Sequence, residues 1–417
     1  MIQRHTCENG LRIVTEKIPS VRSVALGIWV GTGSKYETKQ DNGISHFLEH
    51  MFFKGTTSRS AKEIAETFDE IGGNVNAFTS KEYTCYYARV LDQHAPIALD
   101  VLADMYFHSV FDEEELEKEK NVVIEEISMY EDTPDDLVHD LIARASFADH
   151  PLGSPILGTE EVLRALKRDD LINYIERRYL PTNTVVTVAG NFDDSLIEEI
   201  KRRFSAFQRQ AQQMDVAQPV FAANALAQHK ATEQAHLCIS LPGYPVGHEE
   251  IYSLILLNNV LGGSMSSRLF QEIREERGLA YSVYSYHSSY KETGTFTIYT
   301  GTAPEQVGQV FDIVAHVLRD VAENGITDKE LNKGKEQLKG SLMLSLESTN
   351  SRMSRLGKNE LLLGRHLTLD EILAKIDRVS HESVHAVARE LFRSKLALAM
   401  VSPLDGFPAN VKSDILL

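Results

Sequence analysis

The amino-acid sequence predicts an α+β fold made of two homologous domains, each a mostly antiparallel β-sheet packed with helices. Three observations support this prediction. Short β-prone runs alternate with longer amphipathic runs of helical period. The chain of 417 residues is long enough for two domains with separate cores. The order of elements in the first half of the chain also recurs in the second half.

Local patterns define the expected elements of the first half. Residues 9–19 and 22–31 alternate roughly as strands do, and residues 184–190 are rich in β-branched side chains. A helix from Ser60 is predicted to end at the pair Gly72-Gly73, because glycine is favoured after a helix C-terminus. The other expected elements of this half are strands near 74–80 and 84–91 and helices at 46–55, 94–109, 112–131, 160–179 and 193–207.

The second half repeats this order. The run from Leu254 to Gly263 aligns without gaps on the run from His46 to Gly55. A helix at 267–278, strands at 280–288 and 294–300, a helix at 380–393 and a strand at 396–401 follow in the matching order. The simplest explanation is a duplicated domain. The predicted boundaries are 1–210 for the first domain, 211–230 for a Gln- and Ala-rich linker, and 231–417 for the second domain.

Composition narrows the classes of function. The net charge of −17 argues against binding to nucleic acid or to anionic membrane surfaces, and it is compatible with basic partners. No apolar run of 18 residues is present, so no membrane span is expected. Cys7, Cys85 and Cys238 are scattered and odd in number, which is typical of free thiols in a reducing compartment. The predicted location is therefore cytoplasmic.

One short run, from His46 to His50, specifies a chemistry. It has the pattern H-x-x-E-H, which is the inverzincin signature. On a helix, residues four apart lie on one face, so two imidazoles share one metal ion, for which zinc is the usual choice. Glu49 lies beside them, where it is placed to accept a proton from a metal-bound water. The alternative is a core helix that carries two histidines by chance.

The duplicated half lacks these residues. In the gapless alignment the positions of the two histidines and the glutamate, 46, 50 and 49, are occupied by Leu254, Asn258 and Leu257. The fold therefore does not need them, and a metal site is expected in the first domain alone.

A catalytic zinc site needs a third protein ligand, usually His or Glu. In the acidic helix at 112–131, a helical wheel places Glu119 and Glu126 within the apolar arc, whereas Glu125 lies on the solvated side. A carboxylate within an apolar arc is costly unless it is paired or bound to a cation. Both Glu119 and Glu126 are candidates, and the alternative is a solvated acidic face with two misplaced glutamates.

These features together resemble the pitrilysin/insulinase family of zinc peptidases. The resemblance rests on the H-x-x-E-H run, on Glu126 placed 76 residues after His50, and on Glu119 seven residues earlier. The run Gly72-Gly-Asn-Val-Asn-Ala-Phe-Thr and the duplicated halves are also similar to that family. The size is similar to the short branch that includes the mitochondrial processing peptidase β subunit and its bacterial relatives.

The resemblance implies roles for individual residues. His46, His50 and Glu126 would be the ligands of one Zn²⁺ per chain, Glu49 the general base, and Glu119 a carboxylate behind the ligands.

Further residues are implied to contact the substrate. In the second half, Arg274 and Tyr281 are similar to a pair that family enzymes bring to the substrate. An ordinary helix-to-strand junction is the alternative. Asn76 and Ala77 would pair with an extended peptide. Phe53 would line a substrate pocket, or else be a core aromatic residue.

The resemblance implies a zinc endopeptidase or oligopeptidase that cleaves extended, unfolded peptides, and the net charge of −17 would favour basic ones. Family members enclose substrate in a clamshell chamber of four such domains. A chain with two domains is therefore expected to form a homodimer, or a heterodimer with an inactive relative. The competing hypothesis is a non-catalytic structural or presequence-binding subunit of the same fold. A second motif, H-E-x-x-H at residues 381–385, lacks a convincing third ligand and is not expected to bind metal.

Overall fold

The computed structural model describes residues 2–209 and 216–414, which form two compact units. Unit 1 consists of Met1–Ile127, Pro155–Val216 and Leu344–His366. Unit 2 consists of Ser128–Ser154, Ala217–Met343 and Leu367–Leu417. The units differ from the contiguous ranges 1–210 and 231–417 because each half of the sequence contributes one segment to the other unit.

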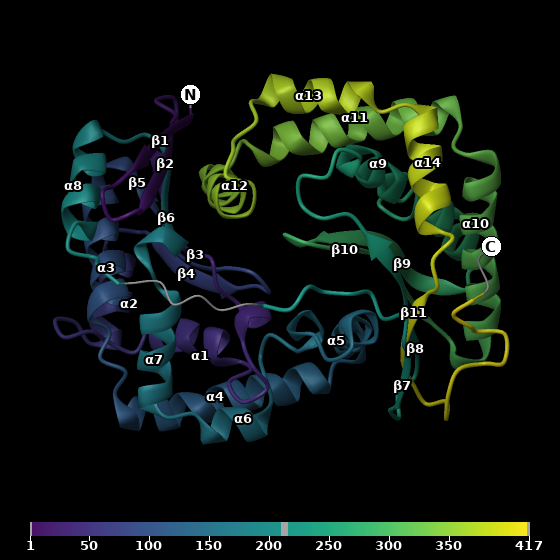
Figure 1. Cartoon of the computed structure of the whole chain (residues 1–417), viewed down its shortest axis with the longest axis horizontal. Coiled ribbons are helices and arrows are strands. Elements are labelled where there is room, and N and C mark those ends of the chain that lie inside the picture. The colour runs from purple at the N-terminus through teal and green to yellow at the C-terminus, as the bar shows by residue number, and fades with distance from the viewer. Residues whose placement is uncertain (1, 210–215, 415–417) are drawn as a thin grey trace. The chain divides into compact units, whose positions relative to one another are not determined.

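Unit 1 contains a six-stranded sheet in the order β1-β2-β6-β3-β5-β4 (Figure 1). Only β2 and β6 are parallel, so the expectation of a mostly antiparallel sheet is confirmed. The strand β1 at the edge was not predicted. The strands are β1 (Ile2–Thr6), β2 (Arg12–Lys17), β3 (Ser23–Val30), β4 (Asn74–Thr79), β5 (Thr84–Leu91) and β6 (Thr184–Gly190).

Helices cover both faces of this sheet. Successive side chains of a strand point to opposite faces, so Leu26 and Ile28 of β3 contribute to one core and Ala25 and Trp29 to another. Residues 160–179, predicted as one helix, form two. The helices are α1 (Ile44–Met51), α2 (Ala61–Glu70), α3 (Ala95–His108), α4 (Glu113–Glu131, to Ile127 in this unit), α6 (Glu160–Ala165), α7 (Arg168–Arg178), α8 (Asp194–Phe204) and α12 (Thr349–Leu362).

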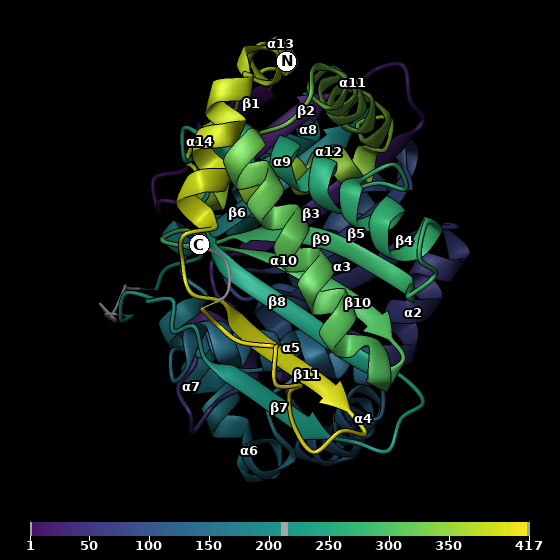
Figure 2. The same ribbon diagram turned by 90° about the vertical axis from the view of Figure 1, so that its right-hand side faces the viewer.

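Unit 2 has a five-stranded sheet in the order β7-β11-β8-β10-β9, again with one parallel pair, β7 and β11 (Figure 2). Its strands are β7 (Ala225–His229), β8 (Ala235–Gly243), β9 (Ala280–Ser289), β10 (Gly294–Thr302) and β11 (Ala397–Ser402). Its helices are α5 (Pro134–Phe147), α9 (Ile251–Leu261), α10 (Val307–Asn324), α11 (Asp328–Ser345), α13 (Leu369–Arg378) and α14 (His381–Leu391).

The two sheets confirm the duplication. In chain order, β2, β3, β4, β5 and β6 correspond to β7, β8, β9, β10 and β11, and both sets have the same spatial order. The range predicted as a linker, 211–230, includes β7, which pairs with β11 and makes the connection shorter than expected. Residues 211–215 of that range lie outside the described residues.

Two helices are exchanged between the halves of the sequence. The helix α12, from the second half, packs on β2, β3 and β6 of unit 1, and its yellow-green ribbon lies beside purple strands in Figure 1. Its Met353 and Leu356 share a buried cluster with Trp29. The helix α5, from the first half, packs on β8 and β11 of unit 2. Each sheet has a second apolar face, which gains free energy when a helix removes it from water.

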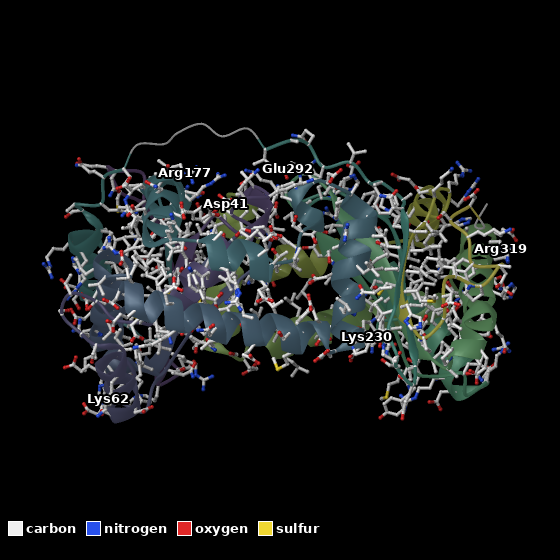
Figure 3. All side chains as sticks on the ribbon, turned by 90° about the horizontal axis from the view of Figure 1, so that it is seen from below. Asp41, Lys62, Arg177, Lys230, Glu292 and Arg319 are labelled. Atoms are coloured by element: carbon white, nitrogen blue, oxygen red, sulfur yellow. The ribbon has the colours of Figure 1, made fainter. Side chains whose placement is uncertain are left out.

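Charged side chains gather at the surface of each unit. Lys62 in unit 1 and Arg319 in unit 2, labelled in Figure 3, are both exposed. Within the part of the chain that the structure describes, no helix is long and apolar enough to cross a membrane.

Candidate metal centre

The helix α1 carries the motif and is held at its N-terminus by Glu37. Its N-cap is Gly43, which has a left-handed φ of 97° and no side-chain cap. One Glu37 oxygen accepts from the backbone N–H of Gly43 (2.7 Å) and from the Asn42 side chain (2.9 Å), and the other accepts from the Ser45 N–H (2.9 Å). A buried glutamate of the preceding loop therefore performs the function of a capping side chain.

The three predicted ligands converge. His46 and His50 lie one turn apart on α1, and Glu126 lies on α4. Glu126 Oε2 is 3.5 Å from His50 Nε2 and 3.8 Å from His46 Nε2. Among the described residues, these three form the one group of at least three His, Cys, Asp or Glu side chains whose ligand atoms all lie within 4.8 Å.

This donor set fits zinc. Bonds of about 2.0–2.2 Å in a tetrahedron place ligand atoms about 3.4 Å apart, close to the observed separations. Two imidazoles and one carboxylate are also the set found in open catalytic zinc sites. The Nδ1 atom of His46 is buried without a hydrogen-bond partner in the described part of the chain.

The metal-free histidines differ in proton affinity. Burial, together with the neighbouring His50, lowers the pKa of His46 to about 4. Burial also lowers the pKa of His50, but hydrogen bonds to Glu119 and Glu126 outweigh it and raise this pKa to about 9. The bond with His50 lowers the pKa of Glu126. In the absence of metal, a proton on His50 therefore takes the place of a cation beside the two glutamates.

Glu49 is largely buried beside the ligands. Thr79, the last residue of β4, donates a hydrogen bond from Oγ1 to Glu49 Oε2 at 2.6 Å. Burial raises the pKa of Glu49, and the bond from Thr79 opposes that rise. A carboxylate with a raised pKa is a stronger base than an ordinary glutamate, which suits a group that takes a proton from water.

Glu119 is buried behind His50. Its Oε1 lies 2.9 Å from His50 Nδ1, and its Oε2 lies 2.5 Å from Lys54 Nζ. Burial raises the pKa of Glu119, but the bonds to His50 and Lys54 reverse this and lower it.

The apolar arc predicted for α4 is wider than the observed one. The wheel places Leu116, Val123 and Ile127 within the arc, and these are buried; it also places Val122 and Met129 at the widened edges of the arc, and these are exposed. The arc nevertheless pointed to the two glutamates that face α1, and Glu125 is exposed. No sequence signal identified Lys54 or Thr79, because each contact depends on tertiary packing.

The other predicted residues of unit 1 are on the two elements that carry His50 and Thr79, or directly after them. Asn76 and Ala77 lie on β4, the terminal strand of the sheet among the described residues, with Asn76 exposed and Ala77 buried. Phe53 follows α1 and is partly buried against the main core. This placement is compatible with both readings of Phe53, as a pocket residue or as a core aromatic.

Arg274 and Tyr281 lie together in unit 2. The Arg274 guanidinium stacks between the rings of Phe270 (4.7 Å to the centroid) and Tyr281 (5.0 Å). Residues Phe270–Glu275 form a π-helix rather than the predicted α-helix, and such turns often occur at functional sites. Tyr281 is 79 % exposed, so its phenol is available to a ligand.

The second motif forms no metal site. His381 Nε2 bonds to Asp328 (2.8 Å) and His385 Nε2 to the carbonyl of Ala322 (2.8 Å). Each nitrogen is thus used in a local contact, and no third ligand joins them in the described ranges.

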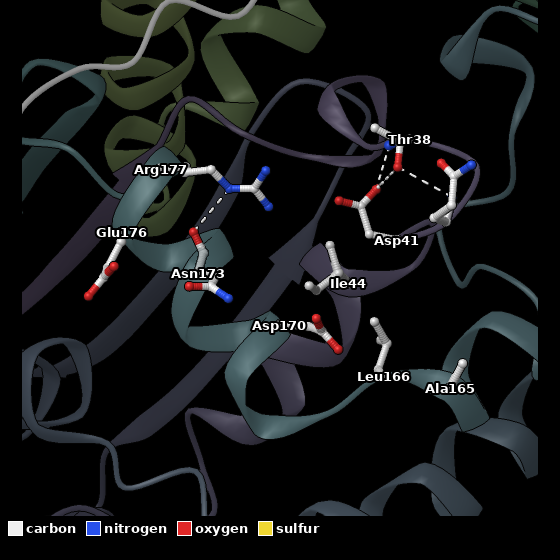
Figure 4. Close-up of a pocket in the computed structure, with 10 residues that line it drawn as sticks. Thr38, Asp41, Ile44, Ala165, Leu166, Asp170, Asn173, Glu176 and Arg177 are labelled. Carbon is white, nitrogen blue, oxygen red and sulfur yellow. Dashed lines mark hydrogen bonds between the residues drawn. The ribbon is translucent and has the colours of Figure 1, made fainter.

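A polar cavity lies beside the start of α1 but outside the metal centre (Figure 4). It has a volume of about 550 Å³, and Ile44 is its contribution from α1. None of the predicted ligands lines it. Its lining residues are Thr38, Gln40, Asp41, Ile44, Ala165, Leu166, Asp170, Asn173, Glu176 and Arg177.

Comparison with protein families gives two matches. The family model of insulinase, peptidase family M16, matches residues 12–160. The family model of the peptidase M16 inactive domain matches residues 165–338. The first match contains all three candidate ligands and Glu49, and the second contains Arg274 and Tyr281.

Individual proteins are similar over almost the whole chain. YmxG of Bacillus subtilis (strain 168), described as an uncharacterized zinc protease, is 59 % identical over 409 residues, covering 98 % of this chain and 100 % of the relative. An uncharacterized zinc protease of Streptomyces coelicolor is 44 % identical over 414 residues, covering 97 % of this chain and 90 % of the relative.

Two solved structures share the fold. One is a crystal structure of a peptidase M16 inactive domain from Pseudomonas fluorescens, with a TM-score of 0.90 and 21 % identity over 98 % of this chain and 99 % of that one. The other is a protease from Helicobacter pylori, with a TM-score of 0.90 and 21 % identity. The match covers 97 % of this chain and 99 % of that one.

Proposed function

We propose that this chain, which belongs to the M16 (insulinase) family of peptidases, hydrolyses peptide bonds with one zinc ion held by His46, His50 and Glu126. The observation that carries the proposal is the convergence of these three donors from α1 and α4, with the partly buried Glu49 beside them. Two relatives described as uncharacterized zinc proteases, 59 % and 44 % identical to this chain, support the same metal.

The residues around the centre have separate tasks. Zinc, when bound, lowers the pKa of a coordinated water and polarises the scissile carbonyl. Glu49 accepts a proton from the attacking water and delivers it to the leaving amine. Thr79 holds one Glu49 oxygen and leaves the other free for that transfer. Glu119 accepts from His50 Nδ1 and so presents Nε2 to the metal.

Substrate binding is proposed for an extended peptide. The strand β4 ends the sheet of unit 1, and a terminal strand offers its main chain to a peptide by strand addition. Asn76 and Ala77 would pair through their main chain with the main chain of the substrate. Phe53 would line the pocket that holds the substrate residue following the cleaved bond. From unit 2, Tyr281 would donate a hydrogen bond to the developing oxyanion while Arg274 orients it.

Enclosure and assembly belong to the same proposal. The chain would form half of a chamber and complete it as a homodimer, or as a heterodimer with an inactive relative. A net charge of −17 would favour short, unfolded and basic peptides in such a chamber. A folded protein cleaved as fast as peptides derived from it would contradict the chamber.

Metal analysis combined with peptide cleavage tests the proposal. Wild type is expected to hold about one zinc per chain, to cleave unstructured peptides, and to lose this activity with a chelator. Glu49→Gln should keep zinc and lose at least about a hundredfold in kcat, whereas Glu126→Gln should lose zinc. Glu125→Gln is the matched control, because its exposed side chain is adjacent on the same helix. If wild type holds stoichiometric zinc but cleaves no peptide, the proposed peptidase activity is refuted and a non-catalytic subunit is favoured.

A further inference from the structure

Two contacts in series run behind His50. His50 Nδ1 meets one oxygen of Glu119 at 2.9 Å, and the other oxygen of Glu119 meets Lys54 Nζ at 2.5 Å. The Glu119 side chain is 6 % exposed and that of Lys54 is 28 % exposed, so solvent weakens this ion pair less than a surface pair. The carboxylate therefore has a fixed rotation, with one oxygen committed to each partner.

The duplicated domain shows that the fold does not require this pair. In the gapless alignment of α1 with α9, the position of Lys54 is occupied by Gly262. The helices α4 and α11 align from Glu113 and Asp328, which matches the buried Leu116 with the buried Leu331. Three residues later, Glu119 is matched by Gly334, which is also buried.

Gly334 packs as Glu119 does, against the helix that corresponds to α1. A Cβ atom added to Gly334 would lie 3.2 Å from Leu256 of α9. The same helix–helix contact thus exists in both units without the lysine and the glutamate in unit 2. Both residues are absent from the copy that also lacks the two histidines. The lysine and the glutamate therefore occur together with the candidate metal ligands, and the fold forms without them.

The ammonium group of Lys54 compensates part of the negative charge around the centre. Glu49, Glu119 and Glu126 are three carboxylates within one partly buried site, and such charges are costly unless compensated. A divalent zinc ion and one ammonium group would balance them. In the described ranges, Lys54 is the lysine or arginine side chain for which an ion pair with one of these three carboxylates is seen.

We infer that Lys54 is a positioning residue of the metal centre: it holds the Glu119 carboxylate in the rotation that orients His50 toward zinc. The inference rests on the proposed zinc site and extends it by one residue. Lys54 touches neither metal nor substrate in this arrangement, and its effect passes through Glu119.

Zinc affinity, measured by competition with a coloured chelator on the full chain, tests this role without activity. Loss of an outer partner of a metal ligand typically weakens binding by about 10–100-fold. Lys54→Met should weaken zinc binding by about tenfold, while Lys54→Arg, which keeps charge and donors, should remain within about threefold of wild type. Lys62→Met, which removes an exposed lysine of α2, is the control and should bind as wild type does.

A double variant separates positioning from general damage to the fold. Lys54→Met should weaken zinc binding little further when Glu119 is already Gln, because the lysine acts through that carboxylate. Equal weakening in both backgrounds would overturn the inference, as would wild-type affinity in Lys54→Met. Thermal unfolding of the metal-free variants checks that they fold, and if Lys54→Met does not, Lys54→Gln is used in the same cycle. Wild type that binds no zinc would refute the metal site itself, whereas wild type that binds zinc without cleaving peptides would refute only the peptidase.

Discussion

Replacing Glu37 by alanine is expected to weaken unit 1 at the start of α1, the helix that carries the candidate ligands His46 and His50. The glutamate accepts the Gly43 and Ser45 N–H groups and the Asn42 amide, at 2.7, 2.9 and 2.9 Å. The first N–H groups of a helix have no partner within the helix, and here they are buried in protein. Glu37→Ala leaves the two backbone N–H groups and one N–H of the Asn42 amide without an acceptor, while the amide keeps its bond to the carbonyl of Pro155.

The cost follows from the number of donors. A buried donor without a partner costs about 1–3 kcal/mol. Two backbone donors and one amide would give several kcal/mol, reduced where water enters the space left by the side chain. We expect the free energy of unfolding of unit 1 to fall by about 2–5 kcal/mol. Glu37→Gln should cost about half as much, because one oxygen remains an acceptor while the new NH₂ group faces an N–H group.

The chain contains one tryptophan, Trp29, which is buried in the sheet of unit 1. Urea unfolding followed by tryptophan fluorescence therefore reports on unit 1 in the presence of unit 2. Glu66→Ala is the control, since this exposed residue of α2 pairs with the exposed Lys62 and its loss should cost less than about 1 kcal/mol. If Glu37→Ala and Glu66→Ala unfold at the same urea concentration, Glu37 does not stabilise α1.

Two further predictions concern protons at the metal centre. Since the pKa of metal-free His50 is about 9 and that of His46 about 4, zinc binding at pH 7 should release about one proton, from His50. Affinity should then rise about tenfold per pH unit below about pH 9; calorimetry in buffers of different ionisation enthalpy measures the release, and none at pH 7 would contradict the assignment. Thr79→Val removes a bond that favours ionised Glu49, so the pKa of Glu49 should rise and the acidic limb of kcat/KM should move about one unit higher. Zinc content should be unchanged, and an unmoved limb would show that Thr79 does not control Glu49.

Some of this centre could be predicted because it depends on local geometry. The helical period places His46 and His50 on one face from their spacing alone. The wheel of α4 singled out Glu119 and Glu126, since carboxylates within an apolar arc need a partner. The element order also predicted the duplication, because helical and extended periods are visible in short windows of sequence.

Other features escaped prediction because they depend on contacts between distant segments. The exchange of α5 and α12 follows from the second apolar face of each sheet, which no local period of either helix reveals. The strands β1 and β7 are short edge strands with exposed residues, so their hydrophobic pattern is weak.

The sequence by itself predicted the candidate ligands, two histidines and a choice of glutamates, because residue type and helical spacing can be read directly from the chain. Tertiary structure decided which side chains support that chemistry. Lys54 meets Glu119, Thr79 meets Glu49, and Glu37 holds the start of α1. A lysine, a threonine and a loop glutamate are common and are solvated by default. Only packing removes the water and gives each of them partners within the protein.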